Sequence, residues 1–120
     1  MGKTIIQQAR GHGSLTYRVR RKAFSYRISY PEKQISGEGE VLKLIHSGGH
    51  SAPLAKIKLG KIIFYNPSAQ GLHEGQKVLI GNDHEAKTGS ILKLKDIPTK
   101  SPVFNIESRS GDGGKFIRTA

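Results

Sequence analysis

The placement of charge constrains this sequence more than any other feature. Residues 1–31 contain seven Lys or Arg side chains and no acid, whereas residues 32–120 contain thirteen basic and nine acidic side chains. Residues 1–22 show no apolar period, so this segment cannot bury enough surface to offset the entropy lost on ordering. We expect this segment to form an extended basic arm that orders on a partner. Basic arms of this kind more often bind nucleic acid than remain idle solvated tails.

After the arm, the sequence predicts short β-strands. Apolar and polar side chains alternate over 24–30 and again over 55–59, which is the period of a strand with one buried face. Gly60 then predicts a tight turn and a hairpin, and no stretch of helical length has a 3.6-residue period. Short strands are expected at 24–30, 41–45, 55–59, 61–65, 78–80, 91–94 and 103–106, which predicts an all-β chain that forms a small barrel.

Composition excludes several classes of site. The chain has 120 residues, which favours one domain, and it has no cysteine, so disulfide scaffolds, thiolate metal sites and cysteine nucleophiles are excluded. No apolar run is long enough for a membrane span or a signal peptide. His46 and His50 flank a Gly-Gly turn, but no carboxylate is spaced to join them, and we expect no metal. A net charge of +11 favours a polyanionic partner instead.

Catalytic and nucleotide-binding motifs are also missing. The glycines at 111–114 precede a lysine, but Arg109 and Phe116 occupy positions where a phosphate-binding loop needs Gly and Ser or Thr. Asp83 and Glu85 are close in sequence but lie in a loop rich in Gly and Asn, where two solvated carboxylates are the simpler interpretation. We therefore expect no enzyme, no cofactor and no small-molecule substrate.

The remaining signal is a basic and aromatic surface suited to RNA. Lys and Arg contact phosphates, and aromatic rings stack on unpaired bases. Tyr17 lies in the polar arm and is interpreted as an RNA contact. Phe24, Tyr26 and Tyr30 fit base stacking and core filling equally well. The turn at 111–114 is open to two interpretations in the same way, as a close approach of backbone to RNA or as an interdomain linker.

Several motifs in order resemble the archaeal ribosomal protein L2 family. The similarity runs along nearly the whole chain, and the motifs are specific together rather than singly. They are Met1-Gly2-Lys3, Ile6-Gln7-Gln8, Arg10-Gly11, Gly13-Ser14, Thr16-Tyr17-Arg18, Val41 to His46, Ser51-Ala52-Pro53-Leu54-Ala55, Gln70-Gly71-Leu72, Ile97-Pro98, Asn105-Ile106-Glu107 and Gly111-Asp112-Gly113-Gly114-Lys115-Phe116 with Arg118.

The resemblance implies an architecture. It divides the chain into a basic extension over 1–36, an OB-fold-like Greek-key barrel over 37–107, and a Gly-rich linker over 108–120 that starts toward a second, SH3-like domain. The family continues into that domain and a tail near the peptidyl-transferase region, so no role there is expected for these residues. Whether the chain is a fragment or an abridged protein is open at this stage.

The chain also departs from the family pattern. His50 stands where the family has Arg, and at neutral pH an imidazole is a weaker phosphate ligand than a guanidinium. Lys93 and Lys100 add positive charge to two other family motifs. We therefore expect some RNA contact to have moved from His50 toward these lysines.

These observations predict a structural RNA-binding protein of the large ribosomal subunit, located in the cytoplasm on the ribosome. Its partners would be large-subunit ribosomal RNA and neighbouring ribosomal proteins, with no membrane partner. A free-standing OB-type RNA-binding module or translation factor is the main alternative, and an adaptor for an acidic protein is another. The expected RNA-binding residues are Lys3, Arg10, His12, Tyr17, Arg18, Arg20, Arg21, Lys22, Arg27, His50, Lys93, Lys100, Lys115 and Arg118.

Overall fold

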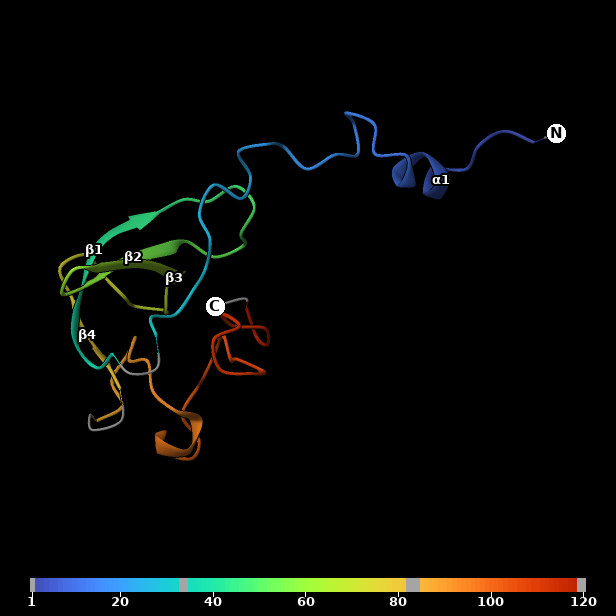
Figure 1. Cartoon of the computed structure of the whole chain (residues 1–120). Coiled ribbons are helices and arrows are strands. Elements are labelled where there is room, and N and C mark those ends of the chain that lie inside the picture. The colour runs from blue at the N-terminus through green and yellow to red at the C-terminus, as the bar shows by residue number, and fades with distance from the viewer. Residues whose placement is uncertain (1, 33–34, 82–84, 119–120) are drawn as a thin grey trace.

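The computed structural model describes residues 2–32, 35–81 and 85–118, and Asp83 of the acidic loop lies outside these ranges. The molecule is elongated, with principal extents of 65 × 28 × 26 Å and a radius of gyration of 17.8 Å. A compact chain of this length would have a radius of gyration of about 14 Å. The excess comes from the N-terminal arm, which runs outward from a small β-domain (Figure 1). The arm is therefore the part of the chain that is farthest from the core.

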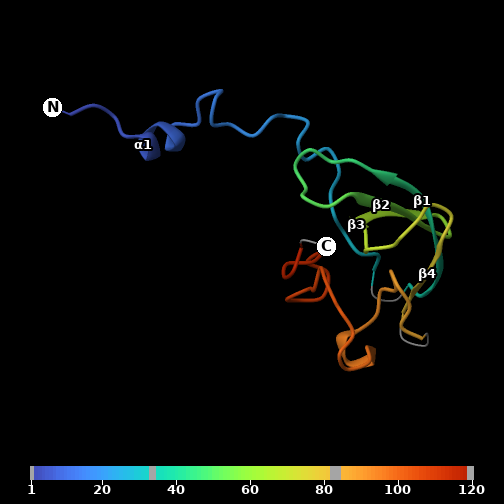
Figure 2. The same cartoon turned by 180° about the vertical axis from the view of Figure 1, so that it is seen from behind.

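The β-domain is built on one antiparallel sheet of four strands. These are β1 (Gly37–Ile45), β2 (Leu54–Leu59), β3 (Ile62–Pro67) and β4 (Lys77–Ile80). The strand order is β3-β2-β1-β4, so the first strand lies inside the sheet (Figure 2). Gly60 has a φ of +60° in the turn between β2 and β3, which confirms the hairpin predicted there.

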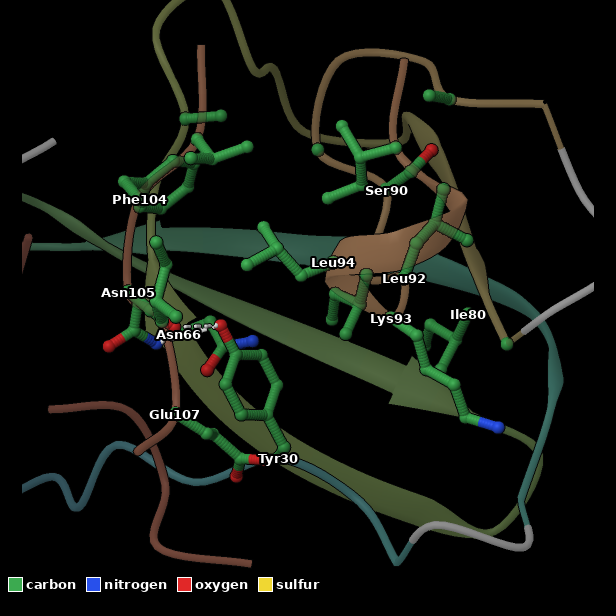
Figure 3. A pocket seen from close by; sticks show the side chains of 18 of the residues that line it. Tyr30, Asn66, Ile80, Ser90, Leu92, Lys93, Leu94, Phe104, Asn105 and Glu107 are labelled. Atoms are coloured by element: carbon green, nitrogen blue, oxygen red, sulfur yellow. Dashed lines mark hydrogen bonds between the residues drawn. The ribbon is translucent and has the colours of Figure 1, made fainter. Parts of the chain in front are cut away.

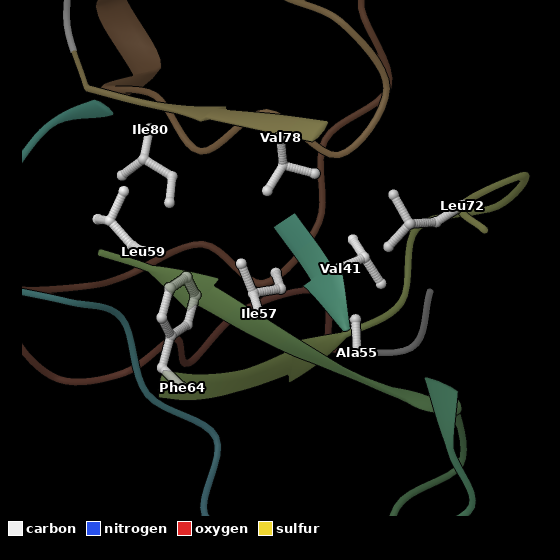
Figure 4. Packing of buried hydrophobic residues seen from close by; sticks show 8 residues of the cluster. All are labelled: Val41, Ala55, Ile57, Leu59, Phe64, Leu72, Val78 and Ile80. Carbon is white, nitrogen blue, oxygen red and sulfur yellow. The ribbon is translucent and has the colours of Figure 1, made fainter. Parts of the chain in front are cut away.

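The core lies on one face of this sheet. The alternation in β2 buries Ile57 and Leu59, while Lys58 between them is exposed. A loop residue, Leu72, closes one side of the cluster (Figure 4). The buried cluster consists of Val41, Ala55, Ile57, Leu59, Phe64, Leu72, Val78 and Ile80.

Short segments extend the sheet at both edges. Ile28 forms a parallel bridge with Tyr65 of β3, and the Ser29 N–H donates to the Tyr65 carbonyl at 3.1 Å. On the other side, Ile91 forms a parallel bridge with Ile80 of β4. The all-β, OB-like fold predicted from the sequence is therefore confirmed, with the strands at 41–45, 55–59, 61–65 and 78–80 in place.

The predicted strands at 24–30, 91–94 and 103–106 are wrong, because each contributes a single bridge instead of a ladder. In the second of them the chain turns into the 3-10 helix η1 (Leu94–Asp96). In the third, Asn105 has a φ of +53°, which a regular strand does not allow. Apolar side chains favour a strand in each of these segments, but none of them pairs with a neighbouring strand over more than one residue.

The arm contains a short helix that its sequence did not predict. The helix α1 (Ile6–Gly11) has no buried residue, and Oε1 of Gln8 accepts a 3.0 Å hydrogen bond from the Ile5 N–H at its start. A helix this short is marginal in water without a partner. Among the described residues, no helix has the length and apolar character that crossing a membrane requires.

Candidate nucleic-acid interface

The structure leaves the sequence-predicted RNA residues open to solvent. Thirteen of the fourteen are exposed, and His50 is half-buried. Those of the arm follow one another along an extended path away from the sheet (Figure 1). Lys93 and Lys100 lie in the segment that follows β4, while Lys115 and Arg118 lie near the end of the chain, after the loop at 107–114. The candidate residues therefore form several separate groups rather than one continuous site.

The arm presents both charge and apolar surface. The Arg10 guanidinium lies 5.9 Å from the centre of the Tyr17 ring, which places a cation over an aromatic face. Leu15 is 87% exposed and Val19 is 62% exposed, so both side chains are mostly open to solvent. A segment with exposed basic, aromatic and aliphatic side chains can contact both phosphates and bases of a folded RNA.

The base of the arm is held by a turn between β1 and β2, residues 47–50, which we name the clasp turn. The buried Ser47 hydroxyl shares a 2.7 Å hydrogen bond with Nδ1 of His50 and donates to the Ala23 carbonyl at 3.4 Å. The Phe24 and His50 rings meet edge to face, with centroids 5.3 Å apart. Gly49 has no room for a side chain, because a Cβ there would overlap the Ala23 carbonyl.

The clasp turn also brings two distant basic residues together. His50 and Arg118 line the same cavity of about 270 Å³, together with Phe24. The sequence predicted His50 and Arg118 singly but not their meeting, since 67 intervening residues separate them. It also missed Ser47 and Gly49, and the one signal for them is the Ser-Gly-Gly-His run itself. The arm thus leaves the domain beside two groups that can contact an anion.

The last loop of the chain, residues 107–114, is held by hydrogen bonds from backbone N–H groups to the carboxylates of Glu107 and Asp112. Oδ2 of Asp112 accepts hydrogen bonds from the Ser108 and Arg109 N–H groups at 2.9 Å each, and Oδ1 accepts one from Gly114 at 2.9 Å. These backbone donors lower the pKa of the Asp112 carboxyl below its usual value. Oε1 of Glu107 accepts from Gly113 at 3.1 Å. Residues 107–114 therefore form an ordered loop.

The glycines of this loop serve packing within the chain. Gly113 and Gly114 are buried, and a Cβ on Gly114 would overlap the side-chain amide of Asn105. Gly111 is exposed and has open space around it. The atoms that approach Gly113 and Gly114 closely therefore belong to the protein itself and not to RNA. Only Gly111 retains the geometry for an approach to RNA.

Tyr30 connects this loop to the sheet. Its hydroxyl donates to the Asn105 carbonyl at 2.7 Å and accepts from Nδ2 of Asn105 at 3.0 Å (Figure 3). Burial raises the pKa of Tyr30 to about 12, because the charged phenolate would be poorly solvated there. Tyr30 therefore has a packing role, whereas Phe24 is 60% exposed beside the clasp turn.

An apolar cavity lies between the sheet and the segment after β4. Its volume is about 790 Å³, and its lining includes Ile57, Leu92 and Phe104, with Lys93 also on its wall (Figure 3). Lys100 does not line it. Within the described ranges there is no group of three His, Asp or Glu side chains placed to hold a metal ion.

No family model matches the chain. Individual relatives do match over its whole length. Large ribosomal subunit protein uL2 of Pyrobaculum calidifontis is 41% identical over 120 residues, which cover 99% of this chain and 49% of the relative. The uL2 protein of Sulfurisphaera tokodaii is 38% identical over 121 residues, which cover 100% of this chain and 51% of the relative. The chain spans about half the length of these relatives. Its sequence is therefore similar along its whole length to archaeal uL2 proteins, and the match is consistent with their amino-terminal half.

Proposed function

We propose that the chain is a structural constituent of the large ribosomal subunit and binds folded ribosomal RNA. Its place would be the cytoplasmic ribosome, with neighbouring ribosomal proteins as further partners, and its role would be structural rather than catalytic. The names of the relatives support this assignment. The observation that carries it in the chain is the exposed arm, which holds seven basic side chains and no acid before residue 32.

The mechanism is electrostatic and steric. Each Lys or Arg that neutralises a phosphate releases condensed counterions, so affinity falls as salt concentration rises. The arm carries these charges away from the sheet (Figure 1), where it can enter a space that the domain cannot. The clasp turn fixes the point at which the arm leaves the domain, while Lys115 and Arg118 are exposed after the loop at 107–114.

The test compares the full chain with a variant lacking residues 2–22. This deletion removes six basic side chains and keeps Ala23 and Phe24, which the clasp turn contacts. If each lost charge neutralises one phosphate, the slope of log K against log salt becomes shallower by about 4–5. Between roughly 50 and 200 mM salt, the full chain then loses about 250 to 1,000 times more affinity than the variant.

The titration uses large-subunit ribosomal RNA, with an unrelated folded RNA as competitor. Steep salt dependence and preference for the ribosomal RNA support the proposal. Equal salt slopes for the two chains would refute the role of the arm. Failure of the full chain to bind RNA at either salt would sink the RNA function altogether and favour an acidic protein as the partner.

A further inference from the structure

One row of side chains crosses the outer face of the sheet, the face opposite the core. In the strand register, Lys43 of β1 lies opposite Lys56 of β2, which in turn lies opposite Tyr65 of β3. Directly opposed residues point to the same face of a sheet. The adjacent register position pairs Ile57 with Phe64, and both are buried in the core, so the row points the other way.

The segment beside β3 adds a second aromatic ring to the row. The Tyr26 ring lies 5.0 Å from the Tyr65 ring, centre to centre, and the two planes are inclined by 46°. Ile28 brings this segment alongside β3 through its bridge to Tyr65. We name Lys43, Lys56, Tyr65 and Tyr26 the outer row. It runs from two ammonium groups to two phenol rings across three strands and the base of the arm.

The charge of the outer row is unbalanced within the sheet. Lys43 and Lys56 are like charges placed directly opposite each other, an arrangement that destabilises a ladder. The acids of β1 serve other pairs, because Glu40 lies opposite Lys58 and Glu38 forms a 2.6 Å ion pair with Lys77. An anion over the outer row would remove the repulsion between its lysines.

The aromatic half of the row selects the kind of anion. Tyr26 and Tyr65 are half-buried, and within the described residues neither hydroxyl has a hydrogen-bond partner. Aromatic rings beside lysines suit a ligand that carries both a phosphate and a π-face. Bases of a duplex are stacked on each other and offer no free face, whereas unpaired bases do.

We propose that the outer row binds an unpaired segment of RNA, with Tyr26 and Tyr65 against a base and Lys43 and Lys56 at the adjoining phosphates. This site is separate from residues 2–22 of the arm and rests on the proposed RNA-binding function. It gives Tyr26, which the sequence left open between core and contact, a role in binding. An acidic peptide would satisfy the lysines but leave the rings without a partner.

The test uses the full chain and two probes, a fluorescent single-stranded RNA of ten uridines and a fully paired RNA duplex. Tyr65→Leu keeps an apolar cover on the sheet but removes the π-face, while Tyr65→Phe keeps the ring. We expect Tyr65→Leu to weaken decamer binding about 5- to 150-fold, as loss of one base stack does. Tyr65→Phe keeps the affinity of the unaltered chain, and duplex binding is unchanged in both variants.

The lysines are tested by salt dependence. Lys56→Gln makes the slope for the single strand shallower by about 0.7, the value for one phosphate. Lys58→Gln is the matched control, since Lys58 lies on the same strand and face but opposite Glu40, and its slope should change less.

Several outcomes would overturn the proposal. The chain could bind duplex RNA while Tyr65→Leu and the unaltered chain bind the decamer equally, which would leave the arm function standing. Equal loss in Tyr65→Phe and Tyr65→Leu would show that the ring face is not the contact. Polyglutamate competing with the decamer as well as unlabelled RNA does would assign the row to an acidic protein.

Discussion

Substitution of the buried Gly114 tests whether the loop requires glycine for its backbone conformation alone or also because there is no room for a side chain. Gly111 and Gly114 lie in the same loop with nearly equal φ values of +92° and +96°. A Cβ on Gly111 meets open space, but one on Gly114 overlaps the amide of Asn105. Alanine at either position pays the same cost of a left-handed backbone, about 1–2 kcal/mol.

Only Gly114→Ala also forces a new methyl group against the Asn105 side chain. Overpacking typically costs about 1–3 kcal/mol, and displacement of the Asn105 side chain also weakens its hydrogen bond to Tyr30, worth about 1 kcal/mol. We therefore expect Gly114→Ala to lower the free energy of local opening by about 2–6 kcal/mol. Gly111→Ala should lower it by about 1–2 kcal/mol.

Hydrogen exchange of the native protein measures this difference where it arises. The Ile106 and Phe116 amides are bonded across the base of the loop at 2.9 and 3.0 Å, and they exchange when the loop opens. Their exchange should be at least about fivefold faster in Gly114→Ala than in Gly111→Ala, since 1.4 kcal/mol is a factor of ten. Equal acceleration in the two variants would show that the space at 114 is irrelevant and that the packing argument is wrong.

Two further predictions concern the clasp turn and the buried phenol. Gly49→Ala should release the base of the arm and speed amide exchange around Ala23, whereas Gly48→Ala, whose Cβ meets open space, should not; similar exchange in both would contradict the clasp. Because the pKa of Tyr30 is raised from 10 to about 12 in the folded chain, the proton stays on in the native state while the unfolded state loses it. Stability should therefore fall between about pH 10 and 12. In urea titrations over that range Tyr30→Phe should show a shallower decline, and an identical decline would refute the assignment.

The sheet could be predicted from the sequence where alternation coincided with a turn. Ile57 and Leu59 alternate with lysines and lead into Gly60, so local pattern and turn chemistry agree on a hairpin. The same alternation over 24–30 predicted a strand and yielded one bridge. A period reports which side chains can share a face, but a ladder also needs a partner strand, and β3 meets this segment at Ile28 alone.

The candidate interface, too, could be predicted from the sequence only in part. Charge is visible in a sequence, so the exposed arm and its basic residues could be predicted. The clasp turn could not, because Ser47 meets Ala23 across 24 residues and neither residue carries a signature of that contact. The outer row was hidden for a similar reason, since the pairing of Lys43 with Lys56 depends on a bulge in β1 that shifts the register between Val41 and Lys43.

The parallel bridge at Ile28 also protects the chain against self-association. An edge strand with free backbone groups is a template on which another chain can add, and β3 is the edge of this sheet. The Ser29 N–H donates to the Tyr65 carbonyl, so the base of the arm covers part of that edge. A truncation that stops before Ala23 leaves this contact intact. One that continues past Ser29 uncovers β3, whose Ile62 and Ile63 are already 38% and 48% exposed, and turns the domain toward edge-to-edge aggregation.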